Sequence, residues 1–412
     1  MRRIDALTAL AALALTACGA DEKPAVCANV GDICPYAGTG TAGFSGDGGP
    51  ATKADLYLPM DLVFDADARG YVVDWNNHRI RRVGSDGVIE TIAGKGELGD
   101  ETAEGVELES SFNHPTSAAF DGEGRLVIAA WHNSRLKRLD VRTGELVNIC
   151  GSGKRAYGGD GGTPDKADLD LPTSLAFAPD GTLYFMDQAN QLIRRISGSG
   201  IVERVAGQCV IGPCAEGEVP KVCPNSARVA CGQDANPDAC RGACGTAFAG
   251  DGGPALEARL AQPVGQAADP GGRIAFTADG TLVFADTRNH RLRAIATDGT
   301  IRTLAGNGTA GFGGDGGPAT EASLKNPVDV EVAPDGTVYV ADMGNSCVRA
   351  IDPATQVIRT VAGRCGKRGT SGDGGPASLA LLDHPYGLAL ASTGDLFIAD
   401  TENSRVRRVK LK

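Results

Sequence analysis

The sequence predicts an all-β fold, a six-bladed β-propeller of four-stranded blades. Two observations lead to this prediction. One phrase recurs six times along the chain, and the two chain ends carry complementary parts of a single repeat. Of the 412 residues, 42% are hydrophobic, which is enough for a large core. The 58 glycines follow no collagen period, so they indicate many tight turns.

The recurring phrase is an apolar run that ends in Asp, with Asn three residues later and a basic residue four after that. In order, its copies are Asp74/Asn77/Arg81, Ala130/Asn133/Lys137, Asp187/Asn190/Arg194, Asp286/Asn289/Arg293, Asp342/Asn345/Arg349 and Asp400/Asn403/Arg407. Successive Asn residues lie 56, 57, 99, 56 and 58 positions apart. The array is therefore regular apart from two insertions, one before blade four and a shorter one near residues 265–272.

Within the fifth unit, residues 327–332, 338–342, 347–351 and 357–362 are apolar and β-branched, and Gly, Pro, Asn and Asp separate them. Four such runs predict four strands per blade. The last unit stops after its third strand, Arg405–Val409, whereas residues 31–44 align without a gap on residues 299–312. We therefore expect the N-terminal strand to complete blade six, which leaves no open sheet edge.

The phrases LVFADTRNHRLR at 282–293 and LFIADTENSRVR at 396–407 resemble NHL repeats. The phrase Gly-Asp-Gly-Gly-Pro-Ala between blades is similar to the NHL region of teneurins and of many bacterial exported NHL proteins. The resemblance covers residues 30–412 apart from a Cys-rich insertion. It implies the propeller fold and a function in binding proteins, glycans or RNA, while a few relatives are metal-dependent lyases or lactonases.

The first residues predict export and lipid attachment. Arg2 and Arg3 precede an apolar run of ten residues, and the sequence Leu-Thr-Ala-Cys ending at Cys18 resembles the bacterial lipobox. We expect a signal peptide at 1–17, a lipidated N-terminus and linker at 18–29, and the propeller at 30–412. Gly19 after Cys18 favours the outer membrane. The predicted location is the bacterial cell envelope, with contact to the membrane only through the lipid.

The composition indicates which binding partners and which cellular compartment to expect. The net charge of −11 argues against a nucleic-acid partner. Twelve cysteines indicate an oxidising compartment. With Cys18 lipidated, the disulfide candidates are Cys27, Cys34, Cys150, Cys209, Cys214, Cys223, Cys231, Cys240, Cys244, Cys347 and Cys365. Their number is odd, so one thiol is free or pairs between chains. Six of them lie in a predicted disulfide-rich insertion at 209–247, where sequence cannot choose the pairing.

Residues for catalysis are not evident. The repeated Asp/Asn/Arg set is interpreted as a structural clasp, and Gly-Asp-Gly-Gly-Pro as a tight turn in which Asp caps backbone amides. No nucleophile or base stands out, and no cofactor is expected. His114 and His384 both precede the Pro that opens a first strand, which makes them weak metal candidates, because a zinc site would need a third His.

Departures from the repeat indicate a binding site. Trp75 and Trp131 occupy the same turn of adjacent blades, with His132 and Tyr386 on the same face. Exposed rigid aromatics suit sugar stacking or a protein anchor. The alternative is that the tryptophans pack between blades. The leading hypothesis is a lipid-anchored envelope module that binds a protein or glycan on this loop-bearing face. The alternatives are a metal-dependent lyase- or lactonase-like enzyme with its site in the central channel, and a structural envelope protein.

Overall fold

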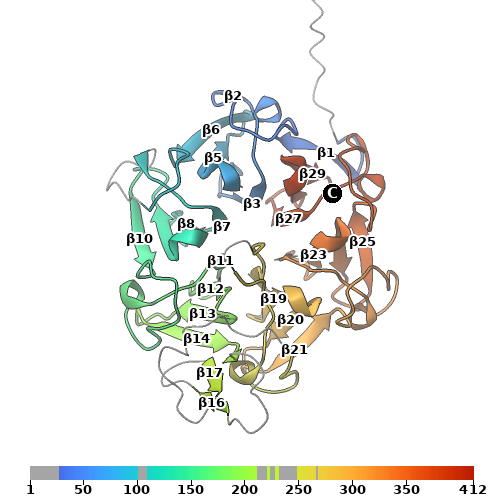
Figure 1. The fold of residues 1–412 in the computed structure, drawn as a ribbon. Helices are drawn as coiled ribbons and strands as arrows, with labels where there is room; N and C mark the ends of the chain where they lie inside the picture. The colour runs from blue at the N-terminus through green and yellow to red at the C-terminus, as the bar shows by residue number, and fades with distance from the viewer. Residues whose placement is uncertain (1–26, 101–108, 211–219, 223–227, 232–247, 266–267) are drawn as a thin grey trace, which may run out of the picture.

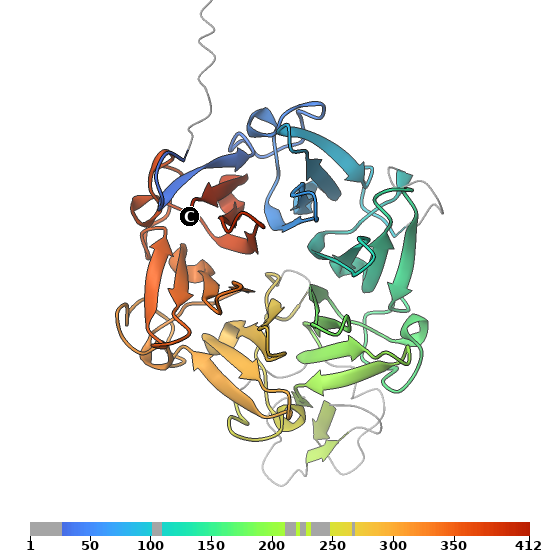
Figure 2. The same cartoon turned by 180° about the vertical axis from the view of Figure 1, so that it is seen from behind.

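The computed structural model describes residues 27–100, 109–210, 220–222, 228–231, 248–265 and 268–412. These residues form a ring of six antiparallel sheets around a central axis, which Figures 1 and 2 show from opposite sides. The predicted six-bladed all-β propeller is therefore confirmed. Among the described helices, none combines the length and apolar character needed to cross a membrane.

Each blade has four main strands. Blades one and two consist of β3 (Pro59–Phe64), β4 (Gly70–Asp74), β5 (Arg79–Val83) and β6 (Val88–Ala93), then β7 (Pro115–Phe120), β8 (Leu126–Ala130), β9 (Arg135–Leu139) and β10 (Leu146–Cys150). Blades three and four consist of β11 (Pro172–Phe177), β12 (Leu183–Asp187), β13 (Leu192–Ile196) and β14 (Val202–Ala206), then β18 (Ile274–Phe276), β19 (Leu282–Asp286), β20 (Arg291–Ile295) and β21 (Ile301–Ala305). Blades five and six consist of β22 (Asp329–Val332), β23 (Val338–Asp342), β24 (Cys347–Ile351) and β25 (Ile358–Ala362), then β27 (Pro385–Leu390), β28 (Leu396–Asp400), β29 (Arg405–Val409) and β1 (Asp32–Ala37).

Short elements join these strands. Single 3-10 turns connect second to third strands at η2 (Trp75–Asn77), η4 (Trp131–Asn133), η8 (Thr287–Asn289), η10 (Met343–Asn345) and η12 (Thr401–Asn403). Further 3-10 turns follow the glycine-rich phrase at η1 (Ala51–Lys53), η5 (Pro164–Lys166), η7 (Ala255–Glu257), η9 (Ala319–Glu321) and η11 (Ala377–Leu379). The insertion after blade three contributes β15 (Cys209–Val210), β16 (Pro220–Val222) and β17 (Arg228–Cys231), which form a separate small sheet.

The ring closes as the chain ends predict. Strand β1 pairs antiparallel with β29, with Ile33 opposite Val409 and Pro35 opposite Arg407. Figure 1 shows this N-terminal strand beside the C-terminal strands. Two-residue strands β2 (Gly49–Pro50) and β26 (Gly375–Pro376) then pair with the fourth strands β6 and β1. The loop that leaves one blade thus covers the outer edge of the next, which removes a template for aggregation.

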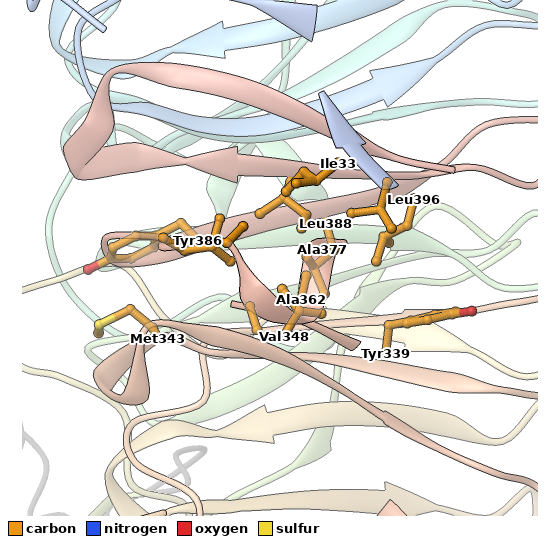
Figure 3. Packing of buried hydrophobic residues seen from close by; sticks show 14 of the residues in the cluster. Ile33, Tyr339, Met343, Val348, Ala362, Ala377, Tyr386, Leu388 and Leu396 are labelled. Carbon is orange, nitrogen blue, oxygen red and sulfur yellow. The ribbon is translucent and has the colours of Figure 1, made fainter. Parts of the chain in front are cut away.

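Apolar side chains fill the spaces between neighbouring blades. Figure 3 shows the cluster between blades five and six, where Ile33, Val348, Leu388 and Leu396 are buried. Ala362 and its small neighbours lie in the same cluster and allow the two sheets to pack closely. The strand that closes the ring is therefore also part of the core.

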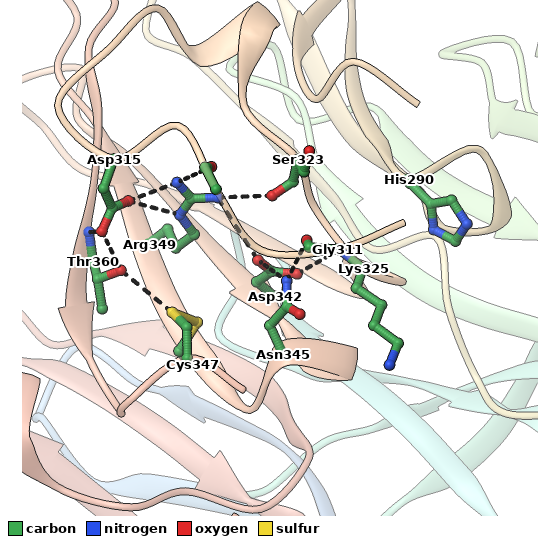
Figure 4. Close-up of polar contacts among 12 residues, drawn as sticks. His290, Gly311, Asp315, Ser323, Lys325, Asp342, Asn345, Cys347, Arg349 and Thr360 are labelled. Carbon is green, nitrogen blue, oxygen red and sulfur yellow. Dashed lines mark hydrogen bonds and ion pairs between the residues drawn. A yellow bond between two sulfur atoms is a disulfide. The ribbon is translucent and has the colours of Figure 1, made fainter. Parts of the chain in front are cut away.

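A buried basic residue, an arginine in five blades and Lys137 in blade two, holds each blade to the loop that enters it. In blade five, Arg349 is 0% exposed and donates to Asp315 (2.6 Å) and to the backbone oxygens of Ser323 and Gly313 (3.0 Å each), as Figure 4 shows. Its Nη1 lies 3.9 Å from a carboxylate oxygen of Asp342. The two repeated phrases therefore bind each other, which the sequence interpretation did not foresee.

The same contact recurs around the ring. The ion pairs are Arg81–Asp47, Arg194–Asp160, Arg293–Asp251 and Arg407–Asp373 at 2.6–2.7 Å, and Lys137–Asp100 at 3.1 Å. The predicted capping of amides by the loop Asp occurs as well, since Asp315 accepts the Thr360 amide at 3.1 Å. Repetition of one contact in every blade marks it as part of the scaffold.

The described cysteines correct one expectation. Cys27 bonds to Cys34 and Cys347 to Cys365, both as disulfides. Cys150, a disulfide candidate by sequence, is instead a free buried thiol in β10. Cys18, Cys214, Cys223, Cys240 and Cys244 lie outside the described residues, and only the backbone is described at Cys209 and Cys231. The disulfide-rich character of the 209–247 insertion and the lipidation of Cys18 stay predictions.

We predict that Arg349→Met lowers the free energy of unfolding by about 3–5 kcal/mol, because it leaves buried Asp342 without its cation. The matched control is Arg359→Met on the exposed side of β25, which should change stability by less than about 0.5 kcal/mol. Equilibrium urea unfolding measures both. Equal stability of the two variants would show that the clasp does not hold the blade.

We predict that replacing Cys347 and Cys365 together by Ser lowers the free energy of unfolding by about 3 kcal/mol, because the bond closes a loop with a sequence separation of 18. The same replacement of Cys27 and Cys34, with a separation of 7, should cost less in a chain-entropy account. Urea unfolding of the two double variants compares them. A larger loss of stability for the Cys27/Cys34 variant than for the Cys347/Cys365 variant would rule out loop entropy as the main source of the stabilisation.

Candidate functional site

The two faces of the ring carry different connections. The turn face, as we call it, carries the turns between second and third strands and the loops that enter the first strands. The hairpin face carries the turns that join first to second and third to fourth strands. All four residues that the sequence assigned to a ligand site belong to the turn face.

The structure gathers these residues but buries two of them. Trp131 is 1% exposed and Tyr386 is 6% exposed, whereas Trp75 and His132 are half-buried. Trp131 packs with Leu171 of the next blade, and Trp75 packs against both. The expectation of exposed aromatic surface is therefore wrong for Trp131 and Tyr386, because both side chains fill space between blades. Trp75 and His132 alone of the four retain contact with solvent.

Three histidines join the tryptophans. The His132 ring stacks on Trp131 with centroids 4.1 Å apart, and the His114 ring lies 4.5 Å from Trp75 and 4.5 Å from His78. Burial and the neighbouring histidines lower the pKa of His114 to about 4. The His114 imidazole is therefore neutral at neutral pH, and its role is packing and hydrogen bonding.

The weak metal candidates do not converge. His114 contacts Asn113 at 2.8 Å and Asn76 at 3.2 Å, and the ring of His384 lies 2.9 Å from its own neighbour Asp383. Within the described ranges, no group of three or more His, Cys, Asp or Glu side chains is placed to hold a metal ion.

The short insertion of blade four closes the channel at the turn face. Gln188 of blade three donates to the backbone oxygens of Pro263 and Asp269 (2.9 and 3.1 Å) and accepts from the Gly271 amide (3.0 Å). Tyr386 of blade six lies near Asp269 from another side of the ring, and burial together with the Asp269 charge raises the pKa of the Tyr386 hydroxyl. Figures 1 and 2 show this segment reaching into the centre of the ring. We call residues 264–272, apart from the undescribed 266–267, the plug.

An aromatic stripe follows the turn face of blade one. Phe44 is 43% exposed, Tyr57 is 37% exposed, and Trp75 is half-buried. Blade-one neighbours hold their segments: the Arg79 guanidinium lies 3.7 Å from the Phe44 ring centroid, and the backbone amide of Asn76, the residue after Trp75, donates to the backbone oxygen of Tyr57 at 3.1 Å. We call Phe44, Tyr57 and Trp75 the aromatic stripe.

Blade one is the one blade with an aromatic residue at all three of these repeat positions. The equivalent sets are Asp100/Asn113/Trp131, Tyr157/Asp170/Gln188, Phe248/Ala261/Thr287, Phe312/Lys325/Met343 and Thr370/Asp383/Thr401. In the sequence, only the last position of each set, that of Trp75 in blade one, stood out as a departure from the repeat. Comparison of the other two positions around the ring would have found Phe44 and Tyr57.

A second site lies in the channel below the plug. The first-strand residues that face the axis form a ring of Asp61, Ser117, Ser174, Arg273, Asp329 and Gly387. Arg273 spans the channel from blade four. Its guanidinium pairs with Asp61 at 2.5 Å and donates to the backbone oxygens of Met60 and Thr116 at 2.9 and 2.7 Å. These buried groups form the floor of a cavity of about 270 Å³, which we call the channel pocket.

The pocket wall is apolar except at one position. Two residues further along the first strands lie Val63, Ala119, Ala176, Ala275 and Ala389, but blade five has Glu331. Most of these wall residues are half-buried, whereas the floor is buried, so the pocket opens toward the hairpin face. Burial raises the pKa of Asp329 to about 7, and burial together with the charge of Asp329 raises the pKa of Glu331 to about 8.

Family models match two parts of the chain. The teneurin NHL domain model matches residues 285–352, and the NHL repeat model matches residues 382–409. These segments cover the third and fourth strands of blade four, the first three strands of blade five, and three of the four strands of blade six.

Individual relatives are distant in sequence. Protein SUPPRESSOR OF QUENCHING 1, chloroplastic, from Arabidopsis thaliana is 26% identical over 78% of this chain, and Teneurin-1 from Homo sapiens is 26% identical over 74% of it. The chain spans 27% and 12% of the lengths of these two relatives.

Solved structures share the fold. An auxiliary nutrient binding protein from Bacteroides ovatus ATCC 8483 superposes with a TM-score of 0.58 at 14% identity, covering 92% of this chain and 76% of its own. The matches to repeat models in phase with the blades, together with the closed ring, confirm the resemblance: the chain is an NHL-repeat β-propeller similar to the NHL domain of teneurins.

Proposed function

We propose that this chain is an extracytoplasmic binding module, tethered to the bacterial outer membrane by lipid on Cys18, that recognises a glycan or protein on its turn face. The signal-peptide pattern of the first residues supports export. The disulfides Cys27–Cys34 and Cys347–Cys365 fit an oxidising compartment. The nutrient-binding role of the B. ovatus protein with the same fold supports binding as the activity.

The aromatic stripe is the observation that carries the proposal. Phe44 and Tyr57 come from the connection that enters blade one, and Trp75 comes from η2, so the fold of the blade fixes their spacing. Aromatic rings that are partly exposed yet rigidly held suit contact with the apolar faces of sugar rings or with a protein anchor. The other five blades lack one or more of the rings, so the stripe is not required by the repeat.

Polar groups beside the stripe can set the orientation of a ligand. Arg79 lies over Phe44, with its Nη1 bonded to the Asn77 oxygen at 3.1 Å. Half-buried Asn76 and His114 lie beside Trp75 toward blade two, with the His114 ring 4.5 Å from the Trp75 ring and 3.2 Å from the Asn76 side-chain oxygen. Apolar surface with a few placed polar groups is the usual composition of a small-ligand or glycan site.

We predict that Phe44→Ala and Tyr57→Ala each weaken binding to the best oligosaccharide of a glycan panel by tenfold or more, with an unchanged melting temperature, because these two exposed stripe residues contribute contact area rather than core packing. A glycan array selects the ligand, and titration calorimetry measures the loss.

Two controls separate contact from packing. Phe312→Ala removes the blade-five equivalent of Phe44, which is 49% exposed, and should leave binding unchanged. Trp131→Ala should lower the free energy of unfolding by about 3–5 kcal/mol, because Trp131 is 1% exposed. The proposal fails if the Phe312 variant loses as much affinity as the stripe variants, or if the stripe variants lose none.

A further inference from the structure

The channel pocket holds two carboxyl groups, Asp329 and Glu331, beside one cation, Arg273, that is already paired with Asp61. Arg273 forms its ion pair with Asp61 at 2.5 Å. Asp329 accepts amide hydrogens from Leu388 (2.6 Å) and Val330 (2.7 Å), and Glu331 accepts one from Leu390. In the part of the chain that the structure describes, no ion pair is recorded for Asp329 or Glu331. Ionising both carboxyl groups beside a cation that is already paired is costly, so they retain protons in the empty pocket near neutral pH and ionise readily only when a further cation enters.

Glu331 is not explained by the repeat. At its position, the other blades have alanine or valine, and Asp329 also stands where the neighbouring blade six has glycine. Both carboxylates come from β22, two residues apart, so alternation along a strand directs them to the same side, the channel. One wall of the pocket is therefore anionic, and Val63, Ala119, Ala176 and Ala275 make the rest apolar.

The two carboxyl groups on one wall and the apolar surface of the rest of the pocket indicate which class of small molecule fits. A bare divalent cation prefers six or more oxygen ligands, and apolar walls supply none. An anion would meet Asp329 and Glu331, while Arg273 is already bonded to Asp61 and to backbone oxygens. A neutral alcohol would leave the carboxylates without a cation. A compact apolar body with a single positive head matches both the wall and the charge.

We infer that the channel pocket is a binding site for a small organic ammonium ion, which enters from the hairpin face, places its charged nitrogen against Glu331 and Asp329, and lays its apolar part along the alanine and valine wall. This site goes beyond the proposed function. The plug and the layer of buried turn residues separate it from the aromatic stripe, so the two sites do not share a ligand-contacting residue.

The titration of the carboxylates gives an independent readout. The charged and titratable groups that face the pocket are Asp61, Arg273, Asp329 and Glu331. The raised pKa values, about 7 for Asp329 and about 8 for Glu331, mean that both groups hold protons in the empty pocket at mildly acidic pH. An ammonium ion requires their ionised forms. Affinity should therefore rise between pH 6 and pH 8.5, and binding at pH 7.5 should release protons.

Titration calorimetry of the full chain with n-butylammonium at pH 8 tests the inference. We expect saturable binding of one equivalent, and no binding of n-butanol or butyrate at the same concentrations. The heat at pH 7.5 should differ between buffers of different ionisation enthalpy, as proton release requires. Binding that is absent, that butyrate or n-butanol reproduces, or that weakens as the pH rises to 8.5 would overturn the inference.

Variants locate the site. Glu331→Gln keeps the shape of the side chain and should weaken n-butylammonium binding by tenfold or more, while Glu321→Gln, on the exposed turn η9, should not change it. Ala176→Leu fills the pocket from another blade without altering a charge, so it should also abolish binding, which keeps the test valid if Glu331→Gln folds poorly. Trp75→Ala should bind n-butylammonium normally. Undiminished binding by both Glu331→Gln and Ala176→Leu would place the site elsewhere and contradict the inference.

Discussion

The pairing of β1 with β29 is the contact on which the other features depend. Ile33 and Val409, residues at opposite ends of the chain, face each other in one sheet. Without this pairing blade six would lack its fourth strand, and the cluster that buries Ile33 with Leu388 and Leu396 would lose one wall. Closure fixes the distances across the channel as well. The ion pair between Arg273 of blade four and Asp61 of blade one exists only in a closed ring.

Closure gives the molecule two unequal faces. At the turn face, the plug and its contacts with Gln188 close the axis, so any ligand there must lie on the surface, as we propose for the aromatic stripe. At the hairpin face, the axis stays open down to the floor formed by Arg273 and its partners. The same ring therefore offers an extended surface suited to a large ligand and a narrow pocket suited to a small one. Their separation means that each can be tested alone.

The features that all repeats share, namely the strands and the closure of the ring, could be predicted from the sequence. The environments of individual residues that differ between blades could not. In blade five the expected strands 338–342 and 347–351 coincide with β23 and β24, because turn residues bound them sharply. The exposure of Trp131 was wrong because a turn position does not reveal that the side chain packs against Leu171 of the next blade. Cys150 was one of the disulfide candidates because an odd cysteine count indicates an unpaired thiol without identifying it; the structure identifies Cys150 as a free thiol. Glu331 could be found in the sequence, because the other first strands have alanine or valine at its position. Arg273 could not, because the insertion before it prevents alignment of the first strand of blade four with the others.

Hydrogen exchange of the full chain, followed by mass spectrometry, tests ring closure most directly. If the N-terminal segment completes blade six, the amides of Asp32–Ala37 should be protected as strongly as those of Arg405–Val409, and destabilising either segment should release both together. Exchange of Asp32–Ala37 at the rate of an unstructured peptide, with the other blades protected, would contradict the closed ring and with it the two faces and the channel pocket.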